Sequence, residues 1–281
     1  MDREFIEVPK EYYCESAKQG RLVRIEYDSR TYYGDNHAIH KDALVYLPYG
    51  YDEADKDTKY NVFYYMHGGS DDANVLFGGL EAKTNLKNIL DNMIANGDIK
   101  PIIVVTPTFY HETDKQAKDL TQNFHHEFVN DLIPKIESEF NVKSERTARI
   151  FGGFSMGAEA TWNIFVHCLS EVADFMPMSG DCWAIETKGG EDYAEKTVDY
   201  IIDHVKQSGY LPVDFRIFAC VGDDGVAYVP MNSMIREMQQ RTENFNDSNL
   251  VYCVAKGGKH TYEYSYQYVY NALPHFLGRG E

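Results

Sequence analysis

The chain has 281 residues, of which 43% are apolar and 25% are charged, and its formal net charge is −17. Such an acidic chain lacks the basic footprint that nucleic-acid binding requires. Its 22 tyrosines and 15 phenylalanines exclude a solvated, disordered chain, and no apolar run approaches the ~20 residues of a membrane helix. We therefore expect a folded protein that binds neither nucleic acid nor a membrane.

The apolar pattern predicts an α/β fold. Alternating runs at residues 22–27 and 43–47 predict an antiparallel pair of strands near the N-terminus. Later runs are almost continuously apolar, as is typical of parallel strands buried on both faces. These later strands are expected at residues 62–66, 102–105, 148–151, 215–220 and 250–254, with helical patterns between them at 80–94, 124–136, 158–165, 193–205, 231–245 and 264–276.

Alternating strands and helices indicate a mostly parallel central sheet with helices on both faces. We find no internal repeat or linker, so residues 1–281 are expected to form a single domain. Residues 180–212 are longer than a minimal crossover, and a long excursion beyond the carboxyl end of a strand often covers a ligand site. We therefore predict an insertion at 180–212 near the active site.

Cysteine and histidine spacing gives no sign of a metal or cofactor site. The five cysteines include no Cys-x-x-Cys pair, and whether two of them form a disulfide is left open. His37 and His40, like His125 and His126, have no third ligand near them in sequence. The N-terminus lacks the apolar stretch of a signal peptide, which fits a cytoplasmic protein or a module of a longer secreted enzyme.

Residues 153–157 read Gly-Phe-Ser-Met-Gly and match the nucleophile elbow Gly-x-Ser-x-Gly. The pentapeptide follows an expected strand and opens an expected helix, and this context makes the match more specific. A sharp turn there would expose the hydroxyl of Ser155, while the flanking glycines would let neighbouring backbone approach closely. We therefore predict that Ser155 is a catalytic nucleophile.

A serine hydroxyl needs a base, and the base needs an orienting acid. His260 follows the last expected strand and is the natural base, so activity should fall below roughly pH 6, near the ordinary pKa of histidine. Asp223 and Asp224 follow the preceding expected strand. We prefer Asp224, because the acid usually lies two or more residues beyond the strand, and Asp223 stays an alternative.

Two backbone N–H groups should hold the oxyanion of the tetrahedral intermediate. Met156, the residue after the nucleophile, supplies one of them at the positive end of its helix. The second should come from residues 67–70, His-Gly-Gly-Ser, which follow the strand that ends at Met66. We predict the N–H of Gly69 or of Ser70.

These motifs resemble the esterase D-like branch of the α/β-hydrolases, in particular the feruloyl and acetylxylan esterases of carbohydrate esterase family one. The likeness runs from about residue 42 to 277 and includes the motifs at 65–69, 103–107, 131–137, 153–157, 178–183, 222–224 and 257–260. It implies an α/β-hydrolase fold, a Ser/Asp/His triad and neither metal nor cofactor. Many members follow the histidine with an acid and a tryptophan, whereas this chain has Thr-Tyr-Glu-Tyr at 261–264.

The resemblance also implies cleavage of esters on decorated plant polysaccharide, often within secreted enzymes of several modules. A feruloyl group is a flat aromatic acid, so its pocket should be apolar and aromatic. Candidate substrate-binding residues are Trp183, Tyr262, Tyr264, Phe77 and Phe109.

We predict a serine esterase that releases ferulate or related hydroxycinnamates from arabinoxylan through an acyl-enzyme. An acetylxylan esterase and a thioesterase like S-formylglutathione hydrolase are the alternatives among enzymes. A catalytically silent carbohydrate-binding module is the alternative outside them, and an intact triad argues against it.

Overall fold

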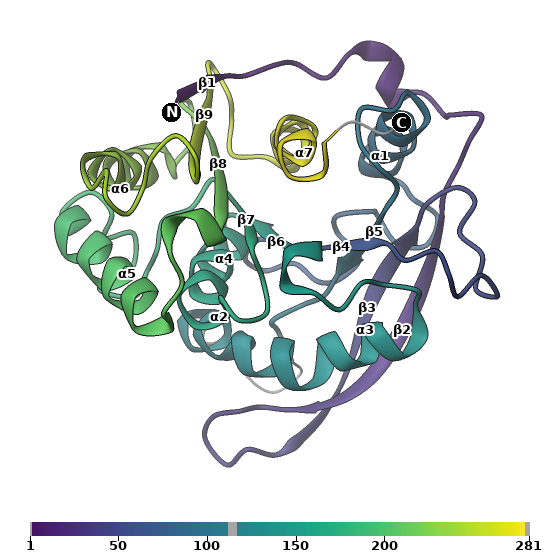
Figure 1. The fold of residues 1–281 in the computed structure, drawn as a ribbon, viewed down its shortest axis with the longest axis horizontal. Helices are drawn as coiled ribbons and strands as arrows, with labels where there is room; N and C mark the ends of the chain where they lie inside the picture. The colour runs from purple at the N-terminus through teal and green to yellow at the C-terminus, as the bar shows by residue number, and fades with distance from the viewer. Residues whose placement is uncertain (1, 112–116, 279–281) are drawn as a thin grey trace.

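A computed structural model describes residues 2–111 and 117–278 of the protein. These residues form one continuous sheet with helices on both faces (Figure 1). The sheet has nine strands in the order β1-β9-β8-β7-β6-β4-β5-β3-β2. They are β1 (Asp2–Glu4), β2 (Arg21–Arg30), β3 (Ala38–Leu47), β4 (Asn61–Met66), β5 (Ile102–Thr106), β6 (Arg149–Phe154), β7 (Asp174–Met178), β8 (Arg216–Gly222) and β9 (Leu250–Ala255).

The central strands β9 to β5 pair in parallel, whereas β3 pairs antiparallel with both β2 and β5. The predicted antiparallel pair is therefore confirmed as β2 and β3, which extend together beyond the rest of the sheet in Figure 1. The predicted α/β class, with a mostly parallel sheet, is confirmed as well.

Helices cover both faces of the sheet, and each face has its own apolar core. Helices α1 and α7 lie on one face, and α2 to α6 lie on the other (Figure 1). Their bounds are α1 (Leu86–Ala95), α2 (Ala117–Glu127), α3 (Ile133–Glu139), α4 (Met156–His167), α5 (Ala194–Ser208), α6 (Tyr228–Gln240) and α7 (Tyr262–Leu277). A turn of π-helix (Phe128–Leu132) joins α2 to α3. Pro134 therefore falls in the first turn of α3, where the N–H that proline lacks would have no partner within the helix.

Two strands were not predicted. The first, β1, has three exposed residues and pairs with β9 at the edge of the sheet, so it carries no apolar pattern. The other, β7, is fully buried but contains Pro177, which lacks an N–H for the ladder and is unusual inside a central strand.

Parallel pairing gathers the carboxyl ends of β4, β6, β8 and β9 at one edge of the sheet. The segments that follow these strands contain residues 67–71, Ser155, residues 223–225 and His260. In an open parallel sheet this edge is where ligands bind. Within residues 2–111 and 117–278, no helix is long and apolar enough to cross a membrane, and all five cysteines are free thiols.

Candidate active site

Ser155 lies in a strained turn between β6 and α4. Its φ of 58° is a backbone conformation that residues with a side chain rarely adopt. The turn is held because the N–H of Ser155 donates to the carbonyl of Met178, at 2.9 Å. A Cβ at Gly153 would lie 2.3 Å from the carbonyl oxygen of Gly157, and a Cβ at Gly157 would lie 2.4 Å from that of Met66. Both flanking glycines are thus required for the backbone to pack this closely.

His260 reaches Ser155, the predicted nucleophile, directly. Its Nε2 atom lies 2.9 Å from Oγ of Ser155, although 105 positions separate the two residues. The imidazole packs against the ring of Phe154, with 4.6 Å between centroids. Burial lowers the pKa of His260 below its ordinary value, and the nearby charge of Lys188 lowers it further. The imidazole therefore stays neutral, and able to accept the proton of Ser155, to a lower pH than a solvated histidine.

The structure does not bring the predicted acid into contact with the base. Asp223 and Asp224 are both exposed, and the carboxylate of Asp223 accepts the N–H of Gly257. Asp224 reaches the histidine loop only through its backbone, since its N–H donates to the carbonyl of Gly258 at 3.0 Å. Within the part of the chain that the structure describes, Nδ1 of His260 is buried and has no hydrogen-bond partner.

The loop after β4, residues 67–71, lies beside Ser155. His67 is fully buried, and burial lowers its pKa to about 4, so the ring is neutral. Its Nδ1 donates to the carbonyl of Gly68 (2.6 Å), while Nε2 accepts the hydroxyl of Thr108 (2.7 Å). A Cβ at Gly69 would lie 2.7 Å from Sδ of Met156. The loop is therefore pressed against the start of α4, next to Ser155.

The two predicted sources of the second oxyanion donor differ in the structure. The N–H of Ser70 donates to the hydroxyl of Tyr110 at 3.0 Å, so it is already engaged. Among the described residues, the N–H of Gly69 has no acceptor. Met156 is the first residue of α4, where an amide has no partner within its own helix. Gly69 and Met156 thus offer two adjacent amides beside Ser155.

A cavity of about 290 Å³ opens beside Ser155 and His260. This volume is at the lower end of the range for small-molecule sites. Trp183 forms part of its wall, and Val226, which is 73% exposed, lies at its surface. The cavity is lined by Gly69, Ser70, Ser155, Met156, Ser179, Gly180, Asp181, Trp183, Lys188, Val226, Ala227, Pro230 and His260.

Residues 40–277 match the model of a protein family described as putative esterase. The match covers most of the chain, including Ser155 and His260. The chain belongs to this esterase family. The family description is that of an ester hydrolase, and the sheet and helices described above form the α/β-hydrolase fold.

The esterase is similar to several known proteins. It is 38% identical to endo-1,4-beta-xylanase Y of Acetivibrio thermocellus over 96% of this chain but only 24% of that protein. It is 34% identical to a mutant of the feruloyl esterase module from Clostridium thermocellum in complex with sinapinate, with a TM-score of 0.82, covering 99% of this chain and 95% of that one.

A ferulic acid esterase from Anaeromyces mucronatus, solved in complex with ferulic acid, shares the fold at 17% identity. Its TM-score is 0.68, and the match covers 95% of each chain. The esterase spans about a quarter of the length of xylanase Y.

Of the five predicted substrate-binding residues, only Trp183 lines the cavity of the esterase. Phe77 and Phe109 do not line it and are buried, with side chains 0% and 2% exposed. Phe77 stacks on Tyr46 in the core, and Phe109 packs against His67.

Tyr262 and Tyr264 also lie away from the cavity lining. The hydroxyl of Tyr262 contacts Gly68 and Asp71, and that of Tyr264 donates to the carbonyl of Gly257 at 3.4 Å. Both tyrosines lie in the first turn of α7.

Three residues beside the site were not identified from the sequence. Tyr110 follows β5 and contacts Ser70. Its neighbour, Phe109, was predicted from the sequence instead, one position too early. Asp181 accepts hydrogen bonds from Nε1 of Trp183 (3.0 Å) and from the N–H of Gly190 (2.9 Å), and so fixes the indole that faces the cavity. Lys188 lines the same cavity from the predicted insertion. The unusual length of residues 180–212 was the signal in the sequence that could have pointed to Lys188.

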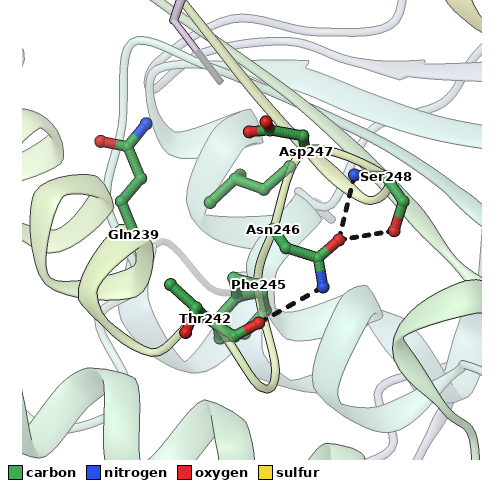
Figure 2. Close-up of a pocket in the computed structure, with 7 residues that line it drawn as sticks. Gln239, Thr242, Phe245, Asn246, Asp247 and Ser248 are labelled. Carbon is green, nitrogen blue, oxygen red and sulfur yellow. Dashed lines mark hydrogen bonds between the residues drawn. The ribbon is translucent and has the colours of Figure 1, made fainter.

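A second hollow lies between α6 and β9 (Figure 2), and neither Ser155 nor His260 lines it. The amide of Asn246 organises its turn: Oδ1 accepts from the N–H and the hydroxyl of Ser248, and Nδ2 donates to the carbonyl of Thr242. This turn precedes β9, so it lies at the opposite end of the strand from His260. Its polar side chains therefore serve the turn and not the catalytic edge.

Proposed function

We propose that the chain is a feruloyl esterase that releases ferulate or related hydroxycinnamates from feruloylated arabinoxylan. The observation that carries the proposal is the 2.9 Å contact between Ser155 and His260 beside a small cavity walled by Trp183. Membership of the esterase family by itself supports ester hydrolysis but not a particular acyl group. The feruloyl specificity is supported by the 34% identical feruloyl esterase module, which was solved with sinapinate.

The reaction is a double displacement. Nε2 of His260 takes the proton of Ser155, and Oγ attacks the ester carbonyl. The amides of Gly69 and Met156 hold the oxyanion that develops, in a geometry fixed before the substrate arrives. The sugar alcohol then leaves with the proton from His260, and water cleaves the acyl-enzyme by the same route.

Asp224 is our proposed acid. Its backbone is bonded to the histidine loop, and a Cβ at the next residue, Gly225, would lie only 3.5 Å from Cβ of His260. The buried, unpartnered Nδ1 of His260 costs about 1–3 kcal/mol, which a carboxylate partner would offset. We propose that another rotamer of the exposed Asp224 side chain supplies that carboxylate, whereas Asp223 is already engaged with Gly257.

The cavity suits a small aromatic acyl group better than a polysaccharide. An indole wall and the apolar surfaces of Val226 and Pro230 match a flat ring, which aromatic side chains contact favourably. The sugar chain would then remain outside the cavity. With a net charge of −17, the protein would repel a strongly acidic substrate at long range.

The test compares the protein on four substrates at equal concentration. Rapid release of ferulate from methyl ferulate and from feruloylated arabinoxylan, with little acetate from acetylated xylan and no cleavage of S-formylglutathione, is the expected result. Preference for acetylated xylan would replace the proposal with an acetylxylan esterase. Activity confined to S-formylglutathione would replace it with a thioesterase.

We further propose that the chain works as one esterase domain within a longer, secreted enzyme. The support is its match to a quarter of xylanase Y, an enzyme named for cleaving the xylan backbone. An esterase and a xylanase in one protein would act on the same polymer. Faster ferulate release from intact bran by the longer protein than by residues 1–281 would support this arrangement, and equal rates would contradict it.

A further inference from the structure

The loop that carries the proposed oxyanion donor is held from two sides by tyrosine hydroxyls. The hydroxyl of Tyr262, at the start of α7, accepts the N–H of Gly68 at 2.8 Å. The hydroxyl of Tyr110, in the segment after β5, accepts the N–H of Ser70 at 3.0 Å. These two amides flank that of Gly69, so the middle amide alone remains available to a ligand in this stretch of the described chain.

The Tyr262 hydroxyl is itself fixed, because it both accepts and donates. It donates to Oδ2 of Asp71 at 2.6 Å, three residues beyond the amide that it holds. Burial raises the pKa of Tyr262 far above its ordinary value, and the bond to Asp71 raises it further, so the hydroxyl stays protonated. One phenol thus joins both ends of the segment 68–71 and sets its curvature.

The segment needs such support because its backbone is strained. Ser70 has a φ of 67°, a left-handed conformation that residues with a side chain avoid. Strain of this kind persists only where the surroundings over-determine the conformation. Tyr262 also packs on Phe154, whose ring lies against that of His260. The same side chain therefore touches the loop on one side and the wall behind the base on the other.

We propose that Tyr262 is a positioning residue for ester hydrolysis: its hydroxyl, together with that of Tyr110, aims the N–H of Gly69 at the oxyanion. The inference rests on the proposed function, since it concerns the transition state of the same reaction. It also assigns Tyr262 a different role from the substrate contact predicted from the sequence. Because an oxyanion forms only in the transition state, this role affects turnover and leaves substrate binding nearly unchanged.

The experiment is Tyr262→Phe in the full chain, assayed on methyl ferulate. Removal of one oxyanion donor typically costs 10²–10³ in kcat, so a donor that is misaimed but present should cost about 10- to 100-fold, with KM changed less than about threefold. Tyr110→Phe should lower kcat by a smaller factor, because water can replace its hydroxyl at the exposed Ser70 amide. Binding of phenylboronic acid, which forms a tetrahedral adduct with Ser155, should weaken by the same factor as kcat/KM. Binding of ferulate should not change.

The matched control is Tyr266→Phe, one turn further along α7. Tyr266 is buried, stacks on Tyr262 and hydrogen-bonds Thr84, so this variant also loses a tyrosine hydroxyl from the same helix. It should keep kcat within about twofold. If Tyr262→Phe is recovered unfolded, Asp71→Ala removes the acceptor of the Tyr262 hydroxyl and should still lower kcat and boronate affinity together.

Equal activity of Tyr262→Phe and Tyr266→Phe would overturn the inference. So would a loss of ferulate affinity parallel to the loss of kcat, which indicates general damage to the site. A wild-type protein that hydrolyses no ester would instead refute the proposed function, and this outcome is distinguished before any variant is compared.

Discussion

The two halves of the active site are built differently. The half that contains Ser155 and residues 67–71 is packed and hydrogen-bonded: Gly68 and Ser70 donate to tyrosine hydroxyls, and Ser155 donates to Met178. The other half comprises the segment after β8 and the predicted insertion. Asp224 and Lys188 are exposed there, and among the described residues none, Asp224 included, forms a hydrogen bond with Nδ1 of His260.

This difference separates chemistry from recognition. Stabilisation of an oxyanion requires dipoles that are already in place when charge develops, because reorganising them costs free energy at the moment of reaction. An acid that orients the base, and a wall that contacts the acyl group, can adjust when the substrate binds. We therefore expect variants of the packed half to change kcat alone, and variants of the exposed half to change KM or pH dependence as well.

Replacing the nucleophile should have the largest effect. Ser155→Ala removes the attacking oxygen, and we expect kcat on methyl ferulate to fall by about 10⁴-fold or more. Ferulate binding, measured by calorimetry, should remain within about threefold of wild type because the cavity is intact. A variant that kept turnover would favour a silent carbohydrate-binding module on this fold.

The acid should come next. Asp224→Asn keeps the shape of the side chain but removes the charge that stabilises the imidazolium, and we expect a fall of about 10²- to 10⁴-fold in kcat. Asp223→Asn is the paired variant, since its side chain can still accept the N–H of Gly257. A large loss in Asp223→Asn and little in Asp224→Asn would assign the acid to Asp223.

Trp183 should affect recognition of the acyl group. Trp183→Ala removes an aromatic wall, and contact with a ring is worth about 1.5–3 kcal/mol, so kcat/KM on methyl ferulate should fall about 10- to 100-fold. The same variant should lose less than about threefold on 4-nitrophenyl acetate, whose acyl group is too small to reach the indole. An equal loss on both substrates would place Trp183 in the support of the triad.

Lys188 should have the smallest effect, and only on pH dependence. Its charge disfavours the protonated imidazole, so Lys188→Gln should raise the pKa of His260 and move the acid limb of kcat/KM to higher pH. Because Lys188 is exposed and screened, the shift should be about a few tenths of a pH unit and should shrink in 1 M salt. Lys196→Gln, which removes a charge lying over the ring of Tyr193, should leave the limb unchanged. A shift to lower pH would contradict the assigned sign.

Much of the catalytic geometry follows from local sequence. The elbow around Ser155 and the loop at 67–70 come directly after apolar runs, and His260 follows another after the short loop 256–259. Parallel strands bring such positions to one edge of the sheet. The motif therefore predicted a contact between residues 105 positions apart, and the structure shows it at 2.9 Å. It also predicted Gly69 and Ser70 together, although only one of their amides remains available.

Predictions about single side chains were less successful. Phe77 and Phe109 are aromatic, as a pocket for a flat ring requires, but both are buried in the core. Tyr110, the residue after Phe109, reaches the loop at 67–71 instead. The strand β7 was missed because Pro177 breaks the expected pattern, although it pairs on both sides. For the aromatic residues, the sequence constrains the type of residue without setting the direction in which its side chain faces.

The sequence by itself determined the order of the strands and helices apart from β1 and β7, and the edge of the sheet where the predicted nucleophile and base meet, because periodicity and turn chemistry are local. The tertiary structure decided which aromatic residues line the cavity and which hydroxyls hold the loop at 67–71. Those outcomes depend on the angle at which α7 and the segment after β5 pack on the sheet, and packing is a property of the whole chain.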